Sequence, residues 1–478
     1  MPHDPPDESA IRRRVADAGQ DHVFRFWDDL PADGRRRLLA QLAEIDFRQL
    51  GRLIDRHARH PEPERLPADL EPAPFIPLPT TDDQRRRRCR MRSRGDDLIA
   101  AGQVAAFTVA GGQGTRLGYD GPKGAFPVGP VSETPLFQIF AEGILAVRRA
   151  SGAAIPWYIM TSEANDRATR DFFAEHDCFG LPPGDVLFFR QGMMPAVDFQ
   201  GRLILSAPDS LARSPDGHGG SLLALARRGM LADMADRGID HISYWQVDNP
   251  LVPPLDPAFL GYHADAASEM SSKMARKRDP FEKLGNFCLS AGRLHVIEYS
   301  DMPDDLAQAT DADGRLRFQA GSIAIHILSR RFAERLTEGG EFALPFHRAE
   351  KKIPYVDAKG NTITPEEPNG VKFERFIFDA LPLAASPVVL EIDRACEFSP
   401  VKNAEGDDSP ATARRDMVRL AARMLDAAGV AVPRNDEGEP TVQVEISPLA
   451  AQTVDELKQV CAARAITNIA ADTYIGPA

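Results

Sequence analysis

The stretch from Val109 to Gly129, VAGGQGTRLGYDGPKGAFPVG, places many glycines in front of an arginine and a lysine. Glycine is selected where a backbone must bend tightly or approach a ligand closely, because a Cβ would clash there. Backbone N–H groups in such a loop can cradle a phosphate chain, and Arg116 and Lys123 follow as cations. The loop therefore predicts an anionic, phosphate-bearing ligand.

Two familiar phosphate-binding fingerprints do not fit this loop. A dinucleotide G-x-G-x-x-G starting at Gly112 would need glycine where Leu117 stands, and a Walker loop would need G-K-[ST] where Gly-Pro-Lys-Gly follows from Gly121. The loop thus fits neither a Rossmann dehydrogenase nor a P-loop NTPase. It follows the apolar run VAAFTVA, which predicts a strand with the ligand beyond its carboxyl end.

A carboxylate follows a second apolar run. In HISYWQVDNP, Asp248 comes directly after a predicted strand. A hard carboxylate at that position can bind Mg²⁺, which would bridge phosphate oxygens. Asp-Asn after a strand is also typical of a turn or a helix cap, so the pattern alone leaves both interpretations open.

The glycine loop resembles the signature of the nucleotide-sugar pyrophosphorylases, and its AGGQGTRLG form is most similar to the eukaryotic-type UDP-N-acetylglucosamine pyrophosphorylases. Further stretches in family order support the resemblance over most of the chain: IPWYIMTS, FGLPPGDVLFFRQGMMPA, APDSLARSPDGHGG, QVDNP, KKIPYVD, PNGVKFERFIFD and EFSPVKNAEGDD. The resemblance implies a Rossmann-like nucleotidyltransferase core. It also implies a reaction in which a sugar 1-phosphate attacks the α-phosphorus of UTP in line, giving UDP-sugar and pyrophosphate.

The resemblance further implies a set of site residues and one cofactor, Mg²⁺. The lysines of PNGVKFE and SPVKN would otherwise read as ordinary surface lysines. The residues implied for catalysis on the phosphates are Arg116, Lys123, Lys372 and Lys402; for nucleotide binding, Ala110, Gly111, Gly112, Gln191 and Gly217; for sugar binding, His218, Gly285, Glu298, Tyr299 and Ser322; and for the metal, Asp248.

Two sugar-side positions depart from the family pattern. His218 stands in PDGHGG and Ser322 in AGSIA, where the N-acetylglucosamine enzymes usually show asparagine. Serine is shorter than asparagine, and a neutral imidazole offers one donor and one acceptor, so the pocket chemistry differs. N-acetylglucosamine 1-phosphate is expected first, with glucose or galactose 1-phosphate, or a broad sugar range, as the alternative. Two other hypotheses for the function are a related enzyme that uses another nucleobase and a non-catalytic nucleotide-sugar sensor.

The elements that must position these residues follow an alternating pattern. Apolar runs at Val104, Ile155, Asp185, His241, Ser322 and Val388 predict strands, and PLFQIFAEGILAVRRA and SLLALARRGMLADMADRG predict helices between them. Such strands are typical of an α/β fold with a mainly parallel sheet covered on both faces. We expect a helical N-terminal region and connector over residues 1–99, a catalytic core over 100–385 and a small C-terminal α+β domain over 386–478.

Composition limits the remaining function classes. A net charge of −13 disfavours broad nucleic-acid binding. No apolar run approaches the ~20 residues that span a bilayer, and the N-terminus lacks the pattern of a secretory signal, so we expect a cytoplasmic protein without a membrane partner.

Five scattered cysteines without CxxC pairing predict free thiols. The basic tract from Arg85 to Arg94 is read as a solvated helix face or connector.

Overall fold

The computed structural model describes residues 7–60, 66–340 and 342–477, so the chain start and part of the predicted connector, 61–65, lie outside the described residues. The described residues form two compact units. The larger unit draws on 67–190, 224–342 and 380–478, and the smaller on 1–66, 191–223 and 343–379. Each unit is assembled from separate segments, so the units do not correspond one to one to the three continuous domains predicted from the sequence. That domain division stays a prediction.

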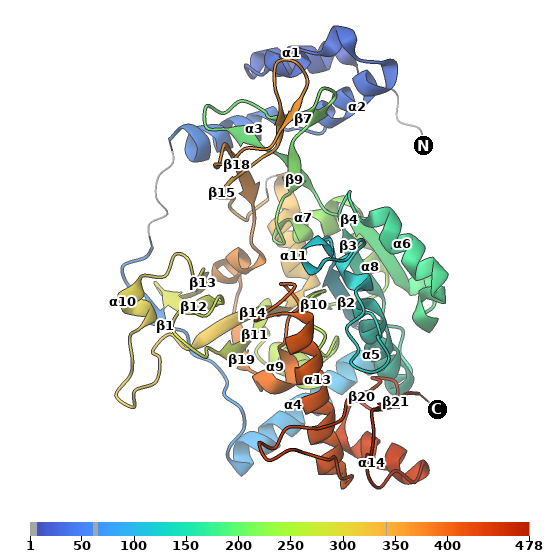
Figure 1. Ribbon diagram of the computed structural model, residues 1–478. Helices are drawn as coiled ribbons and strands as arrows, with labels where there is room; N and C mark the ends of the chain where they lie inside the picture. Colours follow the sequence, from blue (N-terminus) through green and yellow to red (C-terminus); the bar gives the residue numbers. More distant parts are fainter. Residues whose placement is uncertain (1–6, 61–65, 341, 478) are drawn as a thin grey trace. The chain divides into compact units, whose positions relative to one another are not determined.

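A sheet with a parallel centre organises the larger unit (Figure 1). Strands β10, β2, β3 and β4 are parallel neighbours in that order. Antiparallel pairing of β14 with β10 and β12 extends the sheet, and β11 joins β14 to a last parallel strand, β19. The strands are β1 Glu71–Pro72, β2 Val104–Val109, β3 Trp157–Thr161, β4 Val186–Arg190, β10 His241–Gln246, β11 Met270–Arg276, β12 Gly285–Ser290, β13 Arg293–Ile297, β14 Ala320–Ser329 and β19 Val388–Glu391.

Helices cover both faces of the parallel centre. The Trp157 ring of β3 packs edge-on against Phe137 of α5 and Phe173 of α6. The next residue, Tyr158, points to the other face, where its hydroxyl donates to Asp233 of α8 at 2.5 Å. Alternation along one buried strand thus confirms the α/β fold predicted from the apolar runs.

The helices of the larger unit include most of those predicted. The predicted helix SLLALARRGMLADMADRG is divided at Gly229, whose φ of +76° ends one helix before the next begins. The helices are α4 Asp82–Ala100, α5 Leu136–Ser151, α6 Asp166–Glu175, α8 Met230–Asp236, α9 Pro257–Asp265, α10 Asp304–Ala307, α11 Arg330–Thr337, α12 Arg394–Glu397, α13 Pro410–Ala428 and α14 Val454–Ala463, with α7 Gly220–Arg227 preceding α8.

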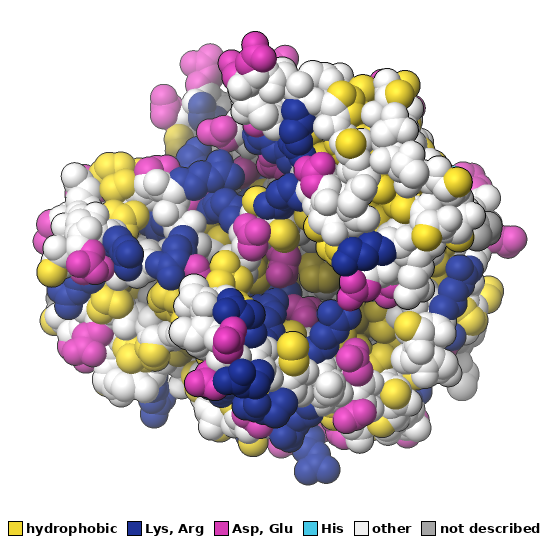
Figure 2. All heavy atoms as spheres, turned by 90° about the horizontal axis from the view of Figure 1, so that it is seen from below, with side chains coloured by type: hydrophobic (Ala, Val, Ile, Leu, Met, Phe, Trp, Pro, Cys, Tyr) yellow, Lys and Arg dark blue, Asp and Glu magenta, His cyan; other side chains and the backbone are white. Residues whose placement is uncertain are grey.

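The basic tract lies within α4. Arg85 and Arg86 pair with the aspartates Asp82 and Asp83 of the first helical turn, and Arg94 pairs with Asp265 of α9 at 3.3 Å. Local carboxylates therefore neutralise part of the tract. Figure 2 likewise shows Lys and Arg side chains interspersed with Asp and Glu over the face that it presents.

Two glycines let α4 and α9 approach backbone to backbone. A Cβ at Gly95 would lie 1.8 Å from the carbonyl oxygen of Pro257, and one at Gly261 would lie 1.8 Å from that of Met91. No side chain fits at such distances, so the helix crossing depends on glycine at both positions.

The C-terminal residues form a small apolar cluster of their own within the larger unit. Helices α13 and α14 and the parallel strands β20 Val444–Ile446 and β21 Thr473–Ile475 bury their own apolar side chains. The carboxylate of Glu445 accepts hydrogen bonds from the N–H groups of Val131 and Ser132, both at 2.8 Å. This anchor fixes the chain that follows the glycine loop.

The smaller unit combines N-terminal helices with short strands. Its core includes apolar side chains of the N-terminal helical segments, with Leu38, Leu42, Leu50 and Ile54 buried. The elements are α1 Glu8–Asp17, α2 Ala32–Ala43, α3 Phe47–Leu53, β5 Met193–Pro195, β6 Val197–Asp198, β7 Leu205–Ala207, β8 Ser210–Leu211, β9 Arg213–Pro215, β15 His347–Lys351, β16 Tyr355–Val356, β17 Thr362–Ile363 and β18 Gly370–Glu374.

Two composition-based expectations can be compared with the structure. Among the described residues, no helix is long and apolar enough to cross a membrane. The cysteines are free thiols, as predicted: Cys89, Cys178, Cys288, Cys396 and Cys461.

Candidate active site

The glycine loop leaves the carboxyl end of β2 with its carbonyl groups held by one buried asparagine. Asn165 Nδ2 donates to the carbonyl oxygens of Ala110 at 2.8 Å and Gly112 at 3.1 Å. Among the described residues, the N–H groups of Gly111 and Gly112 donate to no protein acceptor. The loop therefore leaves the N–H groups of Gly111 and Gly112 available to a ligand while the carbonyl oxygens of Ala110 and Gly112 are occupied, an arrangement that suits an anion.

Lys123 returns to the start of this loop. Its N–H donates to the carbonyl oxygen of Gly112 at 3.1 Å, and a Cβ on Gly112 would lie 3.9 Å from the lysine Cε. The half-buried side chain reaches the carbonyl oxygen of Val401, 3.4 Å from Nζ. Arg116, by contrast, is exposed within the turn Thr115–Leu117. The two predicted cations thus differ in exposure, and only the lysine contacts a distant segment.

Asp248 lies at the neighbouring strand end. Strands β2 and β10 are parallel, and the Val247 N–H donates to the Val109 carbonyl oxygen at 3.1 Å, so both polar segments leave the same edge of the sheet. The Asp248 carbonyl oxygen accepts from the Val401 N–H at 2.7 Å. Val401 therefore contacts Lys123 through its carbonyl group and Asp248 through its N–H, and it carries Lys402 as its neighbour.

Lys402 shares its surroundings with a carboxylate that the sequence analysis did not single out. The Lys402 N–H donates to the Asp408 carbonyl oxygen at 2.6 Å. Burial raises the pKa of the Asp408 carboxyl, the charges of Lys402 and Arg278 oppose that rise, and the Asp248 carboxylate adds to it. These electrostatic influences place Asp248, Lys402 and Asp408 in one local environment of mixed charge.

The predicted sugar-side residues of the larger unit lie on adjacent strands. Gly285 of β12 faces Ser322 of β14 in the register, and a Cβ on Gly285 would lie 3.6 Å from a carboxylate oxygen of Glu298. Tyr299 is 43% exposed. The structure thus brings Gly285, Glu298 and Ser322 together, with Tyr299 next to them in the chain.

Four predicted residues, Gln191, Gly217, His218 and Lys372, belong to the smaller unit. Gln191 is buried and Lys372 is half-buried on β18. Gly217 has φ of +82°, and a Cβ there would lie 2.3 Å from the Arg375 carbonyl oxygen. Only glycine allows the PDGHGG loop to pass so close to the FERFIFD segment.

His218 is neutral at physiological pH. Its Nδ1 accepts from the Ile377 N–H at 3.2 Å, and its ring lies beside those of Phe376 and Phe378. Burial, with a smaller contribution from the charge of His347, lowers the pKa of His218 to about 4. Since Nδ1 is the acceptor of a neutral ring, Nε2 carries the proton and is a hydrogen-bond donor.

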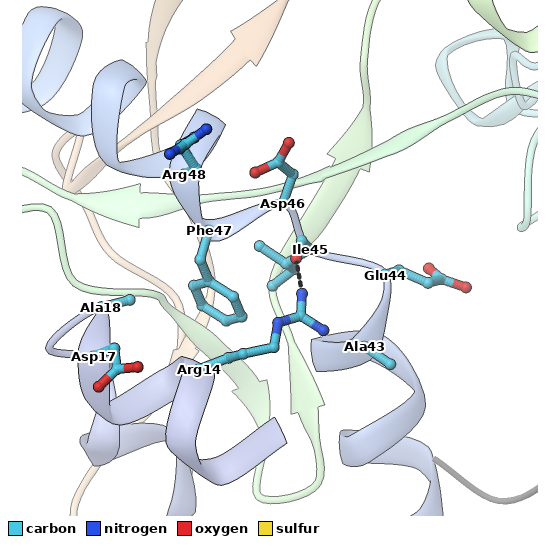
Figure 3. A pocket seen from close by; sticks show the side chains of 9 residues that line it. All are labelled: Arg14, Asp17, Ala18, Ala43, Glu44, Ile45, Asp46, Phe47 and Arg48. Carbon is cyan, nitrogen blue, oxygen red and sulfur yellow. Dashed lines mark hydrogen bonds between the residues drawn. The ribbon is translucent and has the colours of Figure 1, made fainter. Parts of the chain in front are cut away.

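A separate pocket of about 670 Å³ in the smaller unit contains none of the predicted site residues (Figure 3). An Arg14 Nη donates to the Ile45 carbonyl oxygen at 2.5 Å, and the Arg14 guanidinium lies 5.6 Å from the centre of the Phe47 ring. The Arg14 side chain is therefore already engaged by groups of the protein. Its lining is Arg14, Asp17, Ala18, Ala43, Glu44, Ile45, Asp46, Phe47 and Arg48.

Asp248 fits the requirements of a magnesium ligand. It is a half-buried carboxylate at the same sheet edge as the glycine loop, and Asp408 lies within its electrostatic range. Within the described ranges, no three His, Cys, Asp or Glu side chains gather as a metal-binding group. Mg²⁺ is commonly held by one or two carboxylates together with substrate phosphates and water, so this sparse donor set suits it.

Sequence reasoning missed Asn165 and Asp408. Asn165 follows the apolar run IPWYIMTS as Asp248 follows HISYWQV, so the same signal, a polar side chain after a buried strand, was available for it. Asp408 stands in the quoted motif EFSPVKNAEGDD but has no distinguishing spacing of its own. Its proximity to Lys402 arises from a turn that closes only in the fold.

Comparison with known proteins gives consistent matches. The family model for UTP–glucose-1-phosphate uridylyltransferase matches residues 79–427. UDP-N-acetylhexosamine pyrophosphorylase-like protein 1 of Homo sapiens is 38% identical, with 94% of each chain covered. UDP-N-acetylglucosamine diphosphorylase 2 of Arabidopsis thaliana is 37% identical, covering 95% of this chain and 92% of the relative.

A solved structure agrees with these relatives. The uridine diphosphate N-acetylglucosamine pyrophosphorylase of Trypanosoma brucei, in complex with an inhibitor, superposes with a TM-score of 0.80 at 27% identity, over 98% of each chain. The family model covers well over half of the chain, and the resemblance read from the glycine loop is confirmed. The chain belongs to the UTP–glucose-1-phosphate uridylyltransferase family and is a nucleotidyltransferase.

Proposed function

We propose that this enzyme transfers the uridylyl group of UTP to N-acetylglucosamine 1-phosphate, releasing pyrophosphate. The observation that carries the proposal is the convergence of the glycine loop, Lys123, Asp248 and the Lys402 segment at one sheet edge. The names of the human, Arabidopsis and Trypanosoma relatives support the sugar. An oxygen of the sugar phosphate forms the new bond to the α-phosphorus, and the bond to the leaving pyrophosphate breaks.

The chain's own groups meet the main obstacle, which is the approach of two polyanions. Free N–H groups of Gly111 and Gly112 bind phosphate oxygens, and the ammonium of Lys123 lies beside them. Arg116, Lys372 and Lys402 are proposed as the further cations. Such fixed donors stabilise negative charge that moves to the pyrophosphate without the solvent reorganisation that water would require. No protein nucleophile is needed in this reaction.

We propose Mg²⁺ as the cofactor, with Asp248 as its protein ligand. A bound Mg²⁺ neutralises phosphate charge and orients the triphosphate. For the base, Gln191 and Gly217 are the proposed contacts, since a glutamine amide both donates to and accepts from a uracil edge.

A second sugar is favoured by one observation. Ser322 and His218 replace the asparagines expected at the sugar side, and His218 Nδ1 is already occupied by the Ile377 N–H. Each of these side chains therefore offers fewer free hydrogen-bonding groups to an N-acetyl substituent than an asparagine amide would. Glucose or galactose 1-phosphate, or a broad range of sugars, is the second candidate.

The test is a pyrophosphate-release assay with UTP and a panel of N-acetylglucosamine, glucose and galactose 1-phosphates. We expect the highest kcat/KM with N-acetylglucosamine 1-phosphate, and a further shift of the ratio toward it in the double variant His218→Asn/Ser322→Asn. ATP, GTP and CTP serve as controls for the base. Equal rates with all four nucleotides would contradict the proposed uridylyl transfer, and an unmoved sugar ratio would remove His218 and Ser322 from the choice of sugar.

A further inference from the structure

One short segment, residues 397–402, connects the groups proposed to handle phosphate. Within it, Val401 accepts from Lys123 Nζ at 3.4 Å and donates to the Asp248 carbonyl oxygen at 2.7 Å. Lys402 is the next residue. The place of the Lys402 ammonium relative to Asp248 therefore depends on the path of this segment.

The side chain of Asn249 holds that path at two points. Its Nδ2 donates to the Glu397 carbonyl oxygen at 2.7 Å, and its Oδ1 accepts from the Ser399 N–H at 3.0 Å. Asn249 is only 4% exposed. Both ends of the amide are engaged with the same segment, and neither an aspartate nor an aliphatic side chain could make both bonds.

A buried ion pair fixes the start of the segment independently. The Glu397 carboxylate lies 2.5 Å from Lys273 Nζ, which also lies 2.7 Å from Asp256 and is 1% exposed. The ion pair with Lys273 thus fixes the side chain of Glu397 at the start of the segment. The path of the main chain from Glu397 to Ser399 beside the end of β10 depends on the hydrogen bonds of Asn249.

We propose that Asn249 is a positioning residue for nucleotidyl transfer. It touches no substrate, and it acts by setting the Lys402-bearing segment against Asp248. The inference rests on the proposed phosphate role of Lys402. It assigns a positioning role to Asn249 of QVDNP, next to Asp248, the proposed metal ligand.

A double-mutant cycle tests this role. We expect Asn249→Ala and Lys402→Ala each to lower kcat/KM for UTP by ~10²-fold, as misplacement or loss of a charge-stabilising group does. The double variant should be no worse than Lys402→Ala, because Asn249 acts through that lysine. Asn249→Asp keeps the acceptor for Ser399 but loses the donor to Glu397, and an intermediate loss is expected.

Ser243→Ala is the matched control. Ser243 lies on β10, the strand that ends three residues before Asn249; it is 6% exposed, and its Oγ donates to the Pro254 carbonyl oxygen at 2.7 Å. It should lower Tm about as much as Asn249→Ala while leaving kcat/KM unchanged. If Asn249→Ala does not fold, the cycle is run with Asn249→Asp.

The outcomes separate the two claims. Additive losses in the cycle, or an Asn249 variant with unchanged kcat/KM, would overturn the positioning role alone. An unchanged Lys402→Ala would overturn the phosphate role of that lysine and this inference with it. Absence of UTP turnover in the wild type would instead overturn the proposed function.

Discussion

At the scale of single residues, Lys123 is the cation whose surroundings are best defined. Its main chain is bound to Gly112 and its ammonium reaches Val401, so its position relative to the glycine loop is fixed from both ends. A fixed cation stabilises developing charge better than a mobile one, because no ordering is required when the reaction occurs.

Replacing Lys123 by alanine should therefore lower kcat/KM by ~10²-fold or more, the usual effect of removing one charge-stabilising donor. Steady-state kinetics of pyrophosphate release measure the loss, and circular dichroism checks the fold. Lys458→Ala is the control, since Lys458 is an exposed lysine paired with Asp455 on α14. Near-normal activity in Lys123→Ala would show that its ammonium does not act on the phosphates.

His218 gives the protein a defined response to acid. Its pKa in the folded protein is about 4, below the ordinary value of 6.5. Between these values the unfolded chain binds a proton that the folded chain does not, so stability falls as pH decreases from 6.5 toward 4. The contribution of this residue is complete above pH 6.5.

His218→Asn should flatten that dependence. The free energy of unfolding of the wild type should fall more steeply from pH 6.5 to pH 4.5 than that of the variant, by at most about 1.4 kcal/mol per pH unit, the slope for one proton. Urea unfolding at several pH values measures both slopes. Parallel curves would show that His218 titrates normally in the fold.

The residue types and spacings predicted part of the candidate site described above. Lys123 was singled out because it follows the glycine loop, and Asp248 because it follows a buried strand, while the family resemblance supplied their expected roles. Parallel strand ends meet at one edge, where the structure places both segments. Asp408 could not be predicted, since a turn that leaves no periodic pattern brings it to Lys402. Asn165 carried the same signal as Asp248, a polar side chain after a buried strand, but it was not singled out. Asn249 was visible only as the neighbour of Asp248.

At the scale of elements, the crossing of α4 and α9 depends on glycine. Gly95 and Gly261 each bring the opposite backbone to a distance at which a methyl group cannot be placed. The helices cannot separate without disturbing the core cluster, to which Met91 and Leu260 belong.

Gly261→Ala should destabilise the protein by roughly 1–3 kcal/mol, the usual range for overpacking. Thermal and urea unfolding measure the change. Gly184→Ala is the control, because a Cβ at Gly184 meets nothing within 4 Å and its backbone is not in the left-handed region. Equal stability of the two variants would show that the crossing relaxes freely.

The sequence predicted which elements exist better than how they pair. The apolar runs at Val104, Ile155 and His241 became parallel strands, because buried parallel strands are apolar on both faces. The run at Ser322 looks the same but is antiparallel to β10. Strand direction depends on connections far along the chain, and local apolarity does not encode it.

At the scale of the whole molecule, an acidic protein of net charge −13 must bind two phosphorylated substrates. The local cations and a divalent ion have to overcome that overall repulsion. Within the described part of the structure no group of three His, Cys, Asp or Glu side chains gathers, and Asp248 is the ligand proposed for the ion.

Chelation with EDTA should therefore stop pyrophosphate release without lowering Tm, and added Mg²⁺ should restore the rate. Activity and thermal unfolding are measured on the same samples. Asp248→Asn should abolish the restoration. Turnover that EDTA leaves undiminished would contradict the proposed metal, and a large fall in Tm would indicate a structural ion instead.

The hydrogen bond between Asn249 and Ser399 also has a consequence for synthesis on the ribosome. Its partners lie 150 residues apart. At the usual elongation rates of about 5–20 residues per second, roughly 8–30 s pass between the two. During that interval the glycine loop and its aspartate already exist, but the segment that carries Lys402 has not been made. The nascent chain thus contains the strands that carry Asp248 and the glycine loop, the groups proposed to bind phosphate, long before it can become an enzyme.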